Sequence, residues 1–561
     1  MIEQCVFSAF FLCLFTFNGS LYMRLLCKRK QTLPSIKSFF AGFIINGIYF
    51  ELIHLFLPLS IYTLIPLVLF FVYEAVFQFM QNRHIIKNLL HKPKTSLSYI
   101  LLSFFAFFIT YVVLYSVKNS SLNSYDTYLY HASLVSWYNS YRVVPGLAAL
   151  HSRLGMNSLY LFVAAGIDVG IFDKCSAFIL PCVFITATFV YFVHQFFTEE
   201  KDIKFYSFIM ILWILFHSNK QPNLYYDNPS LALGAIFLLN LYKILLKKID
   251  FSTETIFELC LLAAGSFGIK QMGAFNVLIS FIVLGVYCYR NFSNIKNTIK
   301  TIVFCLFIPF ILFLVYTTTN IIQTGFPLFP LPIAKLNLPW TVPNGVAQSL
   351  LDAILCWARA PGADCMNAKD NFSFWFVPWC MNFIPTNAFW LLITGCFIWL
   401  YIFCKKTSKI ALCLFSILLV NLIYWFMSAP DIRFGSSLFF EFFAIAVCLI
   451  ITEKNYSKLL PATLLLLILT GYRCDIIPHI IYNLTLVKNN IRLTTIEKIK
   501  ALPCEKYLVP NEQEIPLYVN IPVKGDQTGD AELPCSAYKP ADNLMLFEPG
   551  NLQSGFCNKK E

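Results

Sequence analysis

The stretch Ile302-Val-Phe-Cys-Leu-Phe-Ile-Pro-Phe-Ile-Leu-Phe-Leu-Val-Tyr316 decides the fold class, because it carries no charged residue and no strongly polar one. It lies within residues 301–319, about the length that a helix needs to cross a bilayer. Similar apolar runs of about 15–25 residues recur along the chain, whereas a membrane barrel shows alternating segments of about 10 residues. The sequence therefore predicts an all-α polytopic membrane protein.

The composition of the whole chain agrees with this prediction. Of the 561 residues, 58% are hydrophobic and 13% are charged, against about 45–50% and about 25% in soluble domains. So few charges cannot cover a soluble globule, which excludes a soluble multidomain enzyme, a disordered chain and a secreted disulfide scaffold. The formal charge of +12 is dispersed in short clusters between apolar runs. Such clusters indicate orientation in a membrane, and no nucleic-acid partner is expected.

Apolar runs predict about 14 (12–14) transmembrane helices. They lie near residues 5–23, 38–58, 60–80, 98–117, 175–197, 204–218, 229–246, 255–269, 271–289, 301–319, 387–404, 408–427, 434–452 and 457–472. Basic residues follow the first run but do not precede it, so the N-terminus is expected outside. Alternation from there places the other basic clusters in the cytoplasm, provided that two short spans turn near Lys270.

This topology divides the chain into two regions. Residues 1–472 are the predicted transmembrane domain, with long outer loops at 118–174 and 320–386. Residues 473–561 are the predicted C-terminal extracytoplasmic tail or small domain, which we expect to cover the outer mouth of the membrane domain. Long irregular segments are usually functional or disordered, so we expect the protein to work on the outer face.

The 19 cysteines mostly lie in apolar runs, where cysteine behaves as a small hydrophobic residue. In an oxidising outer compartment Cys504 could pair with Cys535, and Cys365 with Cys356 or Cys380; the sequence leaves this connectivity open. No metal-binding or nucleotide phosphate-loop motif is present. We therefore expect no cofactor; a divalent metal is possible but not indicated.

The first outer loop carries a candidate catalytic acid. Ser124 can cap a helix, and Asp126 suits the positive end of its first turn. An apolar stripe follows at helical spacing and comprises Tyr130, Leu134, Trp137 and Tyr141. A helix that is too polar to span but has such a stripe is expected to lie in the membrane interface.

Asp126 has basic residues within possible reach, namely His131, His151 and Arg153. A carboxylate so placed can act as a general base toward a hydroxyl group. The histidines can orient the acid or its acceptor, and the planar guanidinium of Arg153 suits phosphate oxygens. The structural alternative is that Asp126 only caps a helix and that the histidines are packing residues.

The later outer segments carry further candidates. Residues 345–359 predict a second interfacial helix, ending at Arg359, which is a supporting candidate. Lys270 and Arg433 are candidates for binding a phosphate, because ionisable residues near membrane depth are rare and commonly functional. The further supporting acids are Asp227 and Asp431. A structural ion pair of Asp431 with Arg433 is the alternative.

Several stretches resemble known membrane proteins. They are Tyr125-Asp126-Thr with Tyr130-His131, Val144-Pro-Gly-Leu-Ala, Leu150-His151-Ser-Arg153-Leu-Gly-Met-Asn157, Gly325-Phe-Pro-Leu-Phe-Pro330, Trp357-Ala-Arg359, Ala429-Pro-Asp431-Ile-Arg433-Phe-Gly and Gly525-Asp526-Gln through Leu533-Pro-Cys535. The chain resembles the GT-C superfamily of integral-membrane glycosyltransferases. More closely, it is similar to a largely uncharacterised family of bacterial membrane proteins found with surface-polysaccharide genes.

This resemblance implies a GT-C-like fold and a role for Asp126 as catalytic base. It also implies a polyprenyl-phosphate-linked sugar as donor, a glycan or lipid-linked acceptor, and contact with membrane lipids. The second acid of the D-x-D motif found in many of these enzymes is replaced by Tyr128, so metal assistance is not indicated and no metal site is predicted.

The preferred hypothesis is a glycosyltransferase in the bacterial inner membrane that acts on the outer face, in capsule, O-antigen or exopolysaccharide biosynthesis. One alternative is an oligosaccharide-repeat polymerase with similar chemistry. Another is a non-enzymatic transporter or flippase for lipid-linked glycans. A transporter is expected to show internal repeats and charges in the middle of its spans, and the sequence shows no repeat.

Overall fold

The structure is a computed structural model that describes residues 2–27, 34–82, 124–218, 224–292, 294–360, 372–405, 408–452, 498–511 and 513–558. Within these residues, 10 helices are long and apolar enough to cross a membrane. They are α1 (Ile2–Cys27), α2 (Ile36–His54), α3 (Ile61–Gln81), α9 (Ser176–Thr198), α11 (Asp227–Leu245), α13 (Ala274–Arg290) with the turn before it, which together span Gln271–Arg290, α14 (Ile295–Thr324), α18 (Asn387–Lys405), α19 (Lys409–Ser428) and α20 (Ile432–Thr452). The chain is a mostly helical, multi-pass membrane protein, as its apolar runs predict.

Two more predicted spans are helices as well. They are α10 (Lys201–Ser218), which begins with charged residues, and α12 (Thr253–Ile269), which is only 17 residues long. The predicted spans 98–117 and 457–472 lie outside the described residues. The total number of spans therefore stays a prediction.

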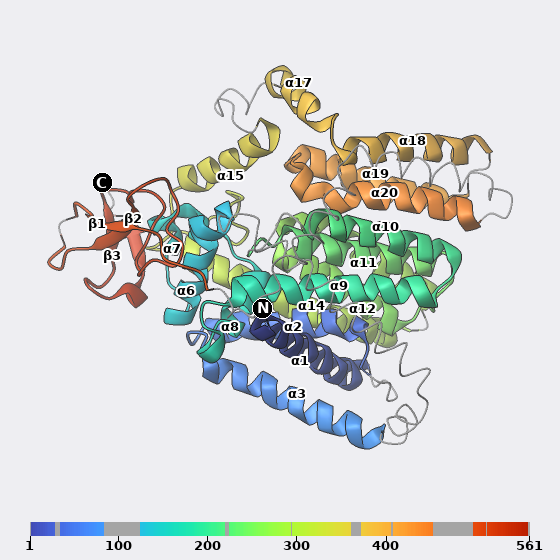
Figure 1. The fold of residues 1–561 in the computed structure, drawn as a ribbon, viewed down its shortest axis with the longest axis horizontal. Helices are drawn as coiled ribbons and strands as arrows, with labels where there is room; N and C mark the ends of the chain where they lie inside the picture. The colour runs from blue at the N-terminus through green and yellow to red at the C-terminus, as the bar shows by residue number, and fades with distance from the viewer. Residues whose placement is uncertain are drawn as a thin grey trace.

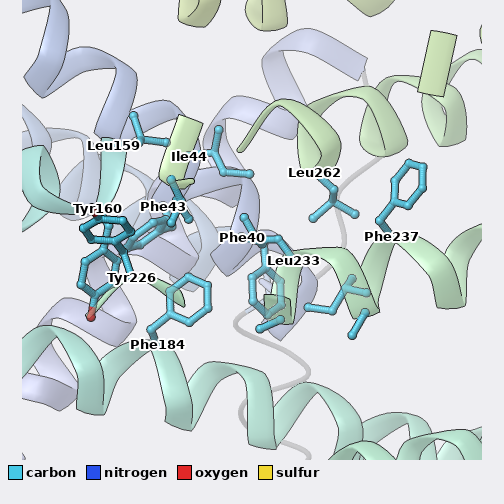
Figure 2. Close-up of a cluster of buried hydrophobic side chains, with 14 of the residues drawn as sticks. Phe40, Phe43, Ile44, Leu159, Tyr160, Phe184, Tyr226, Leu233, Phe237 and Leu262 are labelled. Carbon is cyan, nitrogen blue, oxygen red and sulfur yellow. The ribbon is translucent and has the colours of Figure 1, made fainter. Parts of the chain in front are cut away.

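The helices form one elongated bundle, in which spanning helices joined directly along the chain run in opposite directions (Figure 1). Its interior is built from aromatic and branched side chains, because apolar residues cover most faces of these helices. Figure 2 shows part of this core, where Phe40, Phe43, Tyr160 and Phe184 gather between α2, α9 and α8 (Leu159–Ile167). The rings of Phe43 and Phe184 lie 5.0 Å apart in an edge-to-face arrangement, a favourable geometry for aromatic pairs.

Short elements gather at one end of the bundle, which we call the site end. They are η1 (Thr127–His131), α6 (Ala132–Ser140), α7 (Leu147–Leu150), η2 (Ser152–Gly155), η3 (Gly170–Phe172), η4 (Gln271–Gly273), α15 (Asn344–Arg359) and α17 (Phe372–Phe383). The predicted helix at 345–359 is thus confirmed as α15. Its Leu350 is buried beside Phe326 and Phe329, whereas its Trp357 is 55% exposed.

The first outer-loop helix differs from its prediction. Its apolar stripe does not lie on a lipid surface, because Leu134 and Trp137 are buried inside the protein. Trp137 packs against Tyr141 and against Phe556 of the C-terminal region. The amphipathic pattern therefore identifies a buried face of the helix. The C-terminal region packs against this face, whereas the sequence predicts that membrane lipid does so.

The C-terminal region contains β-structure that the sequence does not predict. Strands β1 (Cys504–Leu508) and β2 (Tyr518–Pro522) pair antiparallel, as do β3 (Leu544–Leu546) and β4 (Phe556–Asn558). A short helical turn, η6 (Leu552–Ser554), precedes β4. These strands lie at the site end, beside α6 and α7 (Figure 1). They are only three to five residues long, although burial alternates along β2 and β3.

The predicted bridge between Cys504 and Cys535 is wrong, because both thiols are free. Cys535 instead donates a hydrogen bond to Ser133, 3.3 Å away. Cys356 is disulfide-bonded, whereas Cys380 is free, which excludes a bond between Cys380 and Cys365. Cys365 lies outside the described residues.

Candidate functional site

Asp126 lies in the first helical turn after Ser124, at the site end of the bundle. Its carboxylate is 16% exposed and faces two arginines. Oδ1 lies 3.8 Å from Nη1 of Arg153, and Oδ2 lies 3.4 Å from Nη1 of Arg433. Both distances exceed those of a tight charge-assisted hydrogen bond. Asp126 is therefore ion-paired with both arginines but has no short hydrogen bond to either.

A second acid shares one of these arginines. Asp227 is the first residue of α11, and its Oδ2 lies 3.3 Å from Nε of Arg433. Its Oδ1 accepts a hydrogen bond from Nζ of Lys270. Arg433 thus connects two carboxylates from distant parts of the chain. We call Asp126, Arg153, Asp227, Lys270 and Arg433 the charged cluster.

The ends of helices bring the charged cluster together. Lys270 lies in the extended break between α12 and η4, and Arg433 lies in the first turn of α20. Asp227 opens α11, where the positive end of the helix favours an acid. Each of these helices ends at the same side of the bundle, so residues remote in sequence share one site.

Aromatic faces hold the cations of the cluster in place. Nζ of Lys270 lies 3.3 Å from the centroid of the Phe434 ring. The guanidinium carbon of Arg433 lies 5.4 Å from the Tyr225 ring centroid, and that of Arg153 lies 5.6 Å from that of Tyr130. Such cation–π contacts attract a cation without neutralising it.

The charged cluster contains three cations and two carboxylates, and the neighbouring carboxylate of Asp431 also favours the charged forms of Arg433 and Lys270. Burial raises the pKa of Asp126 above its ordinary value, an effect that Arg433 and Arg153 oppose. Burial likewise lowers the pKa of Lys270, although Asp227 favours its charged form. The cluster therefore offers three cations to an anionic group, next to a carboxylate able to accept a proton.

The two predicted histidines occupy different places. His131 is buried between the rings of Tyr130 and Tyr226, and neither of its ring nitrogens has a hydrogen-bond partner among the described residues. His151 lies against Tyr538 of the C-terminal region, with ring centroids 5.5 Å apart, and makes no ion pair with Asp126. Burial lowers the pKa of each to about 3, so both imidazoles are neutral.

Asp431 and Arg359 are not members of the charged cluster. Oδ1 of Asp431 accepts a hydrogen bond from the backbone N–H of Arg433, at 2.8 Å, and caps the start of α20. The alternative of a direct ion pair between their side chains is not seen, because the guanidinium of Arg433 turns to the two other acids, although the carboxylate of Asp431 still favours its charged form. The guanidinium carbon of Arg359 lies 5.0 Å from the ring centroid of Trp375 in α17, and Arg359 contacts neither acid of the cluster.

The C-terminal region completes the walls of the site. Asp526 accepts hydrogen bonds from the hydroxyls of Tyr125 and Tyr538, the latter at 3.1 Å. The backbone N–H groups of Thr528 and Gly529 donate to the carbonyl of Tyr128, at 3.0 and 2.8 Å. These bonds fasten the π-helical turn η1, which directly follows Asp126. Tyr125 and Asp526 lie in stretches that carry the sequence resemblance, but no local pattern predicts their contact.

Among the residues that the structure describes, no group of three or more His, Cys, Asp or Glu side chains could hold a metal ion. Both acids of the cluster already form ion pairs with cations of the protein. Tyr128 occupies the position of a second acid after Asp126, and its side chain is buried.

Comparisons with known proteins give one match. A family model described as "Domain of unknown function (DUF8201)" matches residues 1–440. This match covers the described members of the charged cluster, from Asp126 to Arg433, and ends within α20. No curated protein and no solved structure matches the chain.

Proposed function

The chain belongs to the DUF8201 family, and we propose that it is a membrane glycosyltransferase that uses a polyprenyl-phosphate-linked sugar donor. The observation that carries this proposal is the charged cluster, in which the carboxylate of Asp126 lies beside the guanidinium groups of Arg153 and Arg433. A base next to an anion-binding group is what transfer from a sugar phosphate requires. The fold that we propose for the membrane domain is GT-C-like.

The proposed reaction begins at an acceptor hydroxyl. Asp126 takes the hydroxyl proton while the hydroxyl oxygen forms a bond to the anomeric carbon of the donor. The bond between that carbon and the phosphate oxygen breaks, and the electron pair leaves with the lipid phosphate. Arg433, Lys270 and Arg153 hold the leaving phosphate by charge-assisted hydrogen bonds. The neutral His131 orients the acceptor or the acid.

Entry of the phosphate would rearrange the charged cluster. Arg433 spans Asp126 and Asp227 at 3.4 and 3.3 Å, so a phosphate can draw the guanidinium away from Asp126 without leaving Asp227 unpaired. Lys270 keeps its contact with Asp227 throughout. The release of Asp126 from Arg433 raises its proton affinity at the moment when a base is needed.

The positive-inside rule supports an extracytoplasmic site. Basic residues gather at the end of the bundle opposite the charged cluster, where Arg24, Lys243 and Lys405 lie near the ends of their helices. We therefore place the N-terminus, the charged cluster and the C-terminal region outside, in a bacterial inner membrane. Exposed Trp357, together with Phe372 of α17, supports contact of this face with lipid.

The experiment that tests the proposal combines genetics and biochemistry. A host strain carrying Asp126→Asn should express the protein at normal level and lose elongation of its surface polysaccharide. Membranes with the wild-type protein should transfer a radiolabelled sugar from a polyprenyl-phosphate donor, and those with the variant should not. Unchanged product would refute the role of Asp126. Long ladders of repeat units would favour a polymerase, and movement of labelled lipid-linked glycan without a new glycosidic bond would favour a flippase.

A further inference from the structure

A small cavity of about 40 Å³, with a mixed polar and apolar lining, lies next to the charged cluster and is bounded in part by Phe434. The ring of Phe434 contacts Lys270 and also lines this cavity. The cavity lies among α11, α12, η4, α13, α19 and α20. Its polar lining residues are Ser230, Ser266, Asn276, Asn421, Ser437 and Glu441. Apolar side chains such as Leu231, Met272 and Trp425 complete the lining. Six polar side chains around one space within spanning helices nevertheless favour a hydrated or ion-binding site.

Glu441 supplies the only acidic side chain of this lining. It is nine residues beyond the start of α20, about 14 Å along a helix that rises ~1.5 Å per residue. Its residue is 4% exposed, and it makes no ion pair within the described part of the chain. A charged acid costs about 2.5–3.5 kcal/mol at the centre of a spanning helix. A bound cation would offset that cost.

The nearby cations of the protein already form ion pairs with other acids. Lys270 pairs with Asp227, and Arg433 pairs with both acids of the charged cluster. Phe434 lies over Lys270 at 3.3 Å from its ammonium nitrogen. The positive charge that would match Glu441 is therefore not supplied by the charged cluster.

The chemistry of the lining selects the class of cation. Carboxylate, amide and hydroxyl oxygens are ligands for hard cations. One carboxylate among neutral oxygens balances a single positive charge, whereas divalent sites use more acids. Small residues leave the space open: a Cβ at Gly234 would lie 3.1 Å from the amide nitrogen of Asn276.

We infer that this cavity binds one alkali cation, held by the carboxylate of Glu441 and by amide and hydroxyl oxygens of Asn276, Asn421 and Ser437. Sodium and potassium share the required chemistry, and the experiment distinguishes them. The ion lies on the membrane side of the charged cluster and adds positive charge beneath it. This inference does not depend on the glycosyltransferase proposal, because it concerns ion binding alone.

The test uses the full-length protein in detergent. Its melting temperature is measured in sodium chloride, potassium chloride and choline chloride at equal ionic strength. The bound cation should raise the melting temperature above that in choline, because a ligand that binds only the folded state stabilises it. Glu441→Gln should lose this increase. Equal melting temperatures in the three salts would overturn the inference.

Glu51→Gln is the matched control, because Glu51 is also a fully buried acid in a spanning helix. Its Oε1 accepts a hydrogen bond from Asn157 at 2.8 Å, away from the cavity lining. This variant should keep the response to the cation. A loss of the response in Glu51→Gln would show a general effect of buried acids and would also overturn the inference.

Direct binding keeps the inference testable if Glu441→Gln does not fold. Radioactive sodium should bind the purified wild-type protein and be displaced by the unlabelled ion, with potassium as competitor to rank the two. Asn421→Leu, which keeps the carboxylate, should weaken this binding several-fold. Absence of displaceable binding to the wild-type protein, for sodium and for radioactive rubidium as a potassium substitute, would overturn the inference.

Discussion

The two ends of the helical bundle use charge in different ways. At the end opposite the site, Glu74 is completely buried, and its carboxylate accepts hydrogen bonds from Ser20, Arg24 and Gln78 at 3.1, 2.5 and 2.7 Å. Lys248 pairs with Glu200 and Asp202 at 2.6 and 2.8 Å. Each of these charges has close partners of the opposite sign or strong hydrogen bonds.

The charged groups of the cluster at the site end make different contacts. Its arginine–carboxylate distances are 3.3–3.8 Å, whereas Lys270 contacts Asp227 closely. Aromatic rings lie beside Lys270, Arg153 and Arg433, as the ring of Phe77 lies beside Arg24 at the opposite end. Short ion pairs fix helices relative to one another, whereas long arginine–carboxylate pairs can exchange partners. The difference teaches that burial and pairing alone do not indicate a functional site; the long contacts of Arg153 and Arg433, which a substrate anion can replace, distinguish the site end.

The largest effect is expected at Asp126. Asp126→Asn removes the proposed base with almost no change in volume, and loss of a positioned base typically lowers the rate by about 10²–10⁴-fold. The measurement is the rate of sugar transfer in membranes at matched expression. Asp202→Asn is the control at the opposite end, because Asp202 is also an ion-paired acid, 3% exposed. That variant should lose thermal stability and keep its rate per folded molecule.

An equal loss of sugar transfer in Asp126→Asn and Asp202→Asn would contradict the proposed difference in role between the two ends of the bundle. It would mean that both acids support the bundle and that neither takes part in chemistry. The melting temperatures of the two variants separate these outcomes, because a purely structural role requires Asp126→Asn to melt at a clearly lower temperature.

The next effect in size compares two arginines. Arg433→Gln should weaken donor binding by about 10–100-fold, since hydrogen bonds to charged groups contribute about 1.5–3 kcal/mol and 1.4 kcal/mol corresponds to tenfold. Arg24→Gln should instead destabilise the fold by about 3–5 kcal/mol, because it leaves the buried Glu74 without its cation. Donor affinity and thermal unfolding are measured on both variants. A fall in donor affinity for Arg24→Gln, or none for Arg433→Gln, would contradict the assignment of the two ends.

The sequence predicts the membrane fold well because its signal is local. Each apolar run, such as 301–319, specifies a helix by its own length and composition, and basic clusters specify the alternation. It also identifies the five members of the charged cluster as candidates, because ionisable residues at the ends of spans are few. These predictions depend on nothing outside the segment concerned.

Pairing cannot be predicted in the same way. Asp126 and Arg433 meet across 307 positions of the chain, and Tyr125 and Asp526 across 401. The nearest acid to Arg433 in sequence is Asp431, yet backbone geometry directs Asp431 to the start of α20. The packing of helices that are distant in sequence decides the partner of each charge. Residue spacing within one segment carries no information about that packing.

A smaller effect is expected at the contact between the C-terminal region and η1. Gly529 has φ +60°, and a Cβ there would lie 2.3 Å from the carbonyl oxygen of Lys500 and 2.9 Å from the ring of Tyr128. Gly529→Ala should displace this turn from Asp126 and lower kcat by roughly tenfold, equivalent to about 1.4 kcal/mol, with little change in KM for the donor. Steady-state kinetics separate the two constants.

Gly525→Ala is the matched control for Gly529→Ala. Gly525 has φ +76°, so an alanine there carries a similar backbone strain, but its Cβ meets nothing within 4 Å. Its kcat should stay close to that of the wild-type protein. Equal kcat values for the two variants would show that backbone strain, and not displacement of η1, causes the loss.

The smallest expected effect is a shift in the pH dependence of transfer. Burial raises the pKa of Asp126, and Arg433 and Arg153 lower it. Because the base form reacts, activity should increase as the pH increases through this raised pKa. The same shift lowers the stability of the fold at higher pH. Between the pKa of Asp126 in the unfolded protein and its raised pKa in the folded protein, the folded state binds more protons than the unfolded state. The free energy of unfolding therefore decreases as the pH increases through this interval. Activity and stability should therefore change in opposite directions across that interval.

Removal of one opposing arginine sharpens this last test. Arg153→Gln should move the acidic limb of kcat/KM to a higher pH, because the carboxylate loses a cation 3.8 Å away. Lys248→Gln removes a cation at the opposite end of the bundle and should leave the limb where it is. A limb at the ordinary pKa of aspartate, or one that Lys248→Gln moves as far as Arg153→Gln, would show that the titrating group is not Asp126. An upward shift confined to Arg153→Gln would instead place the titrating carboxylate within reach of the site's own cations.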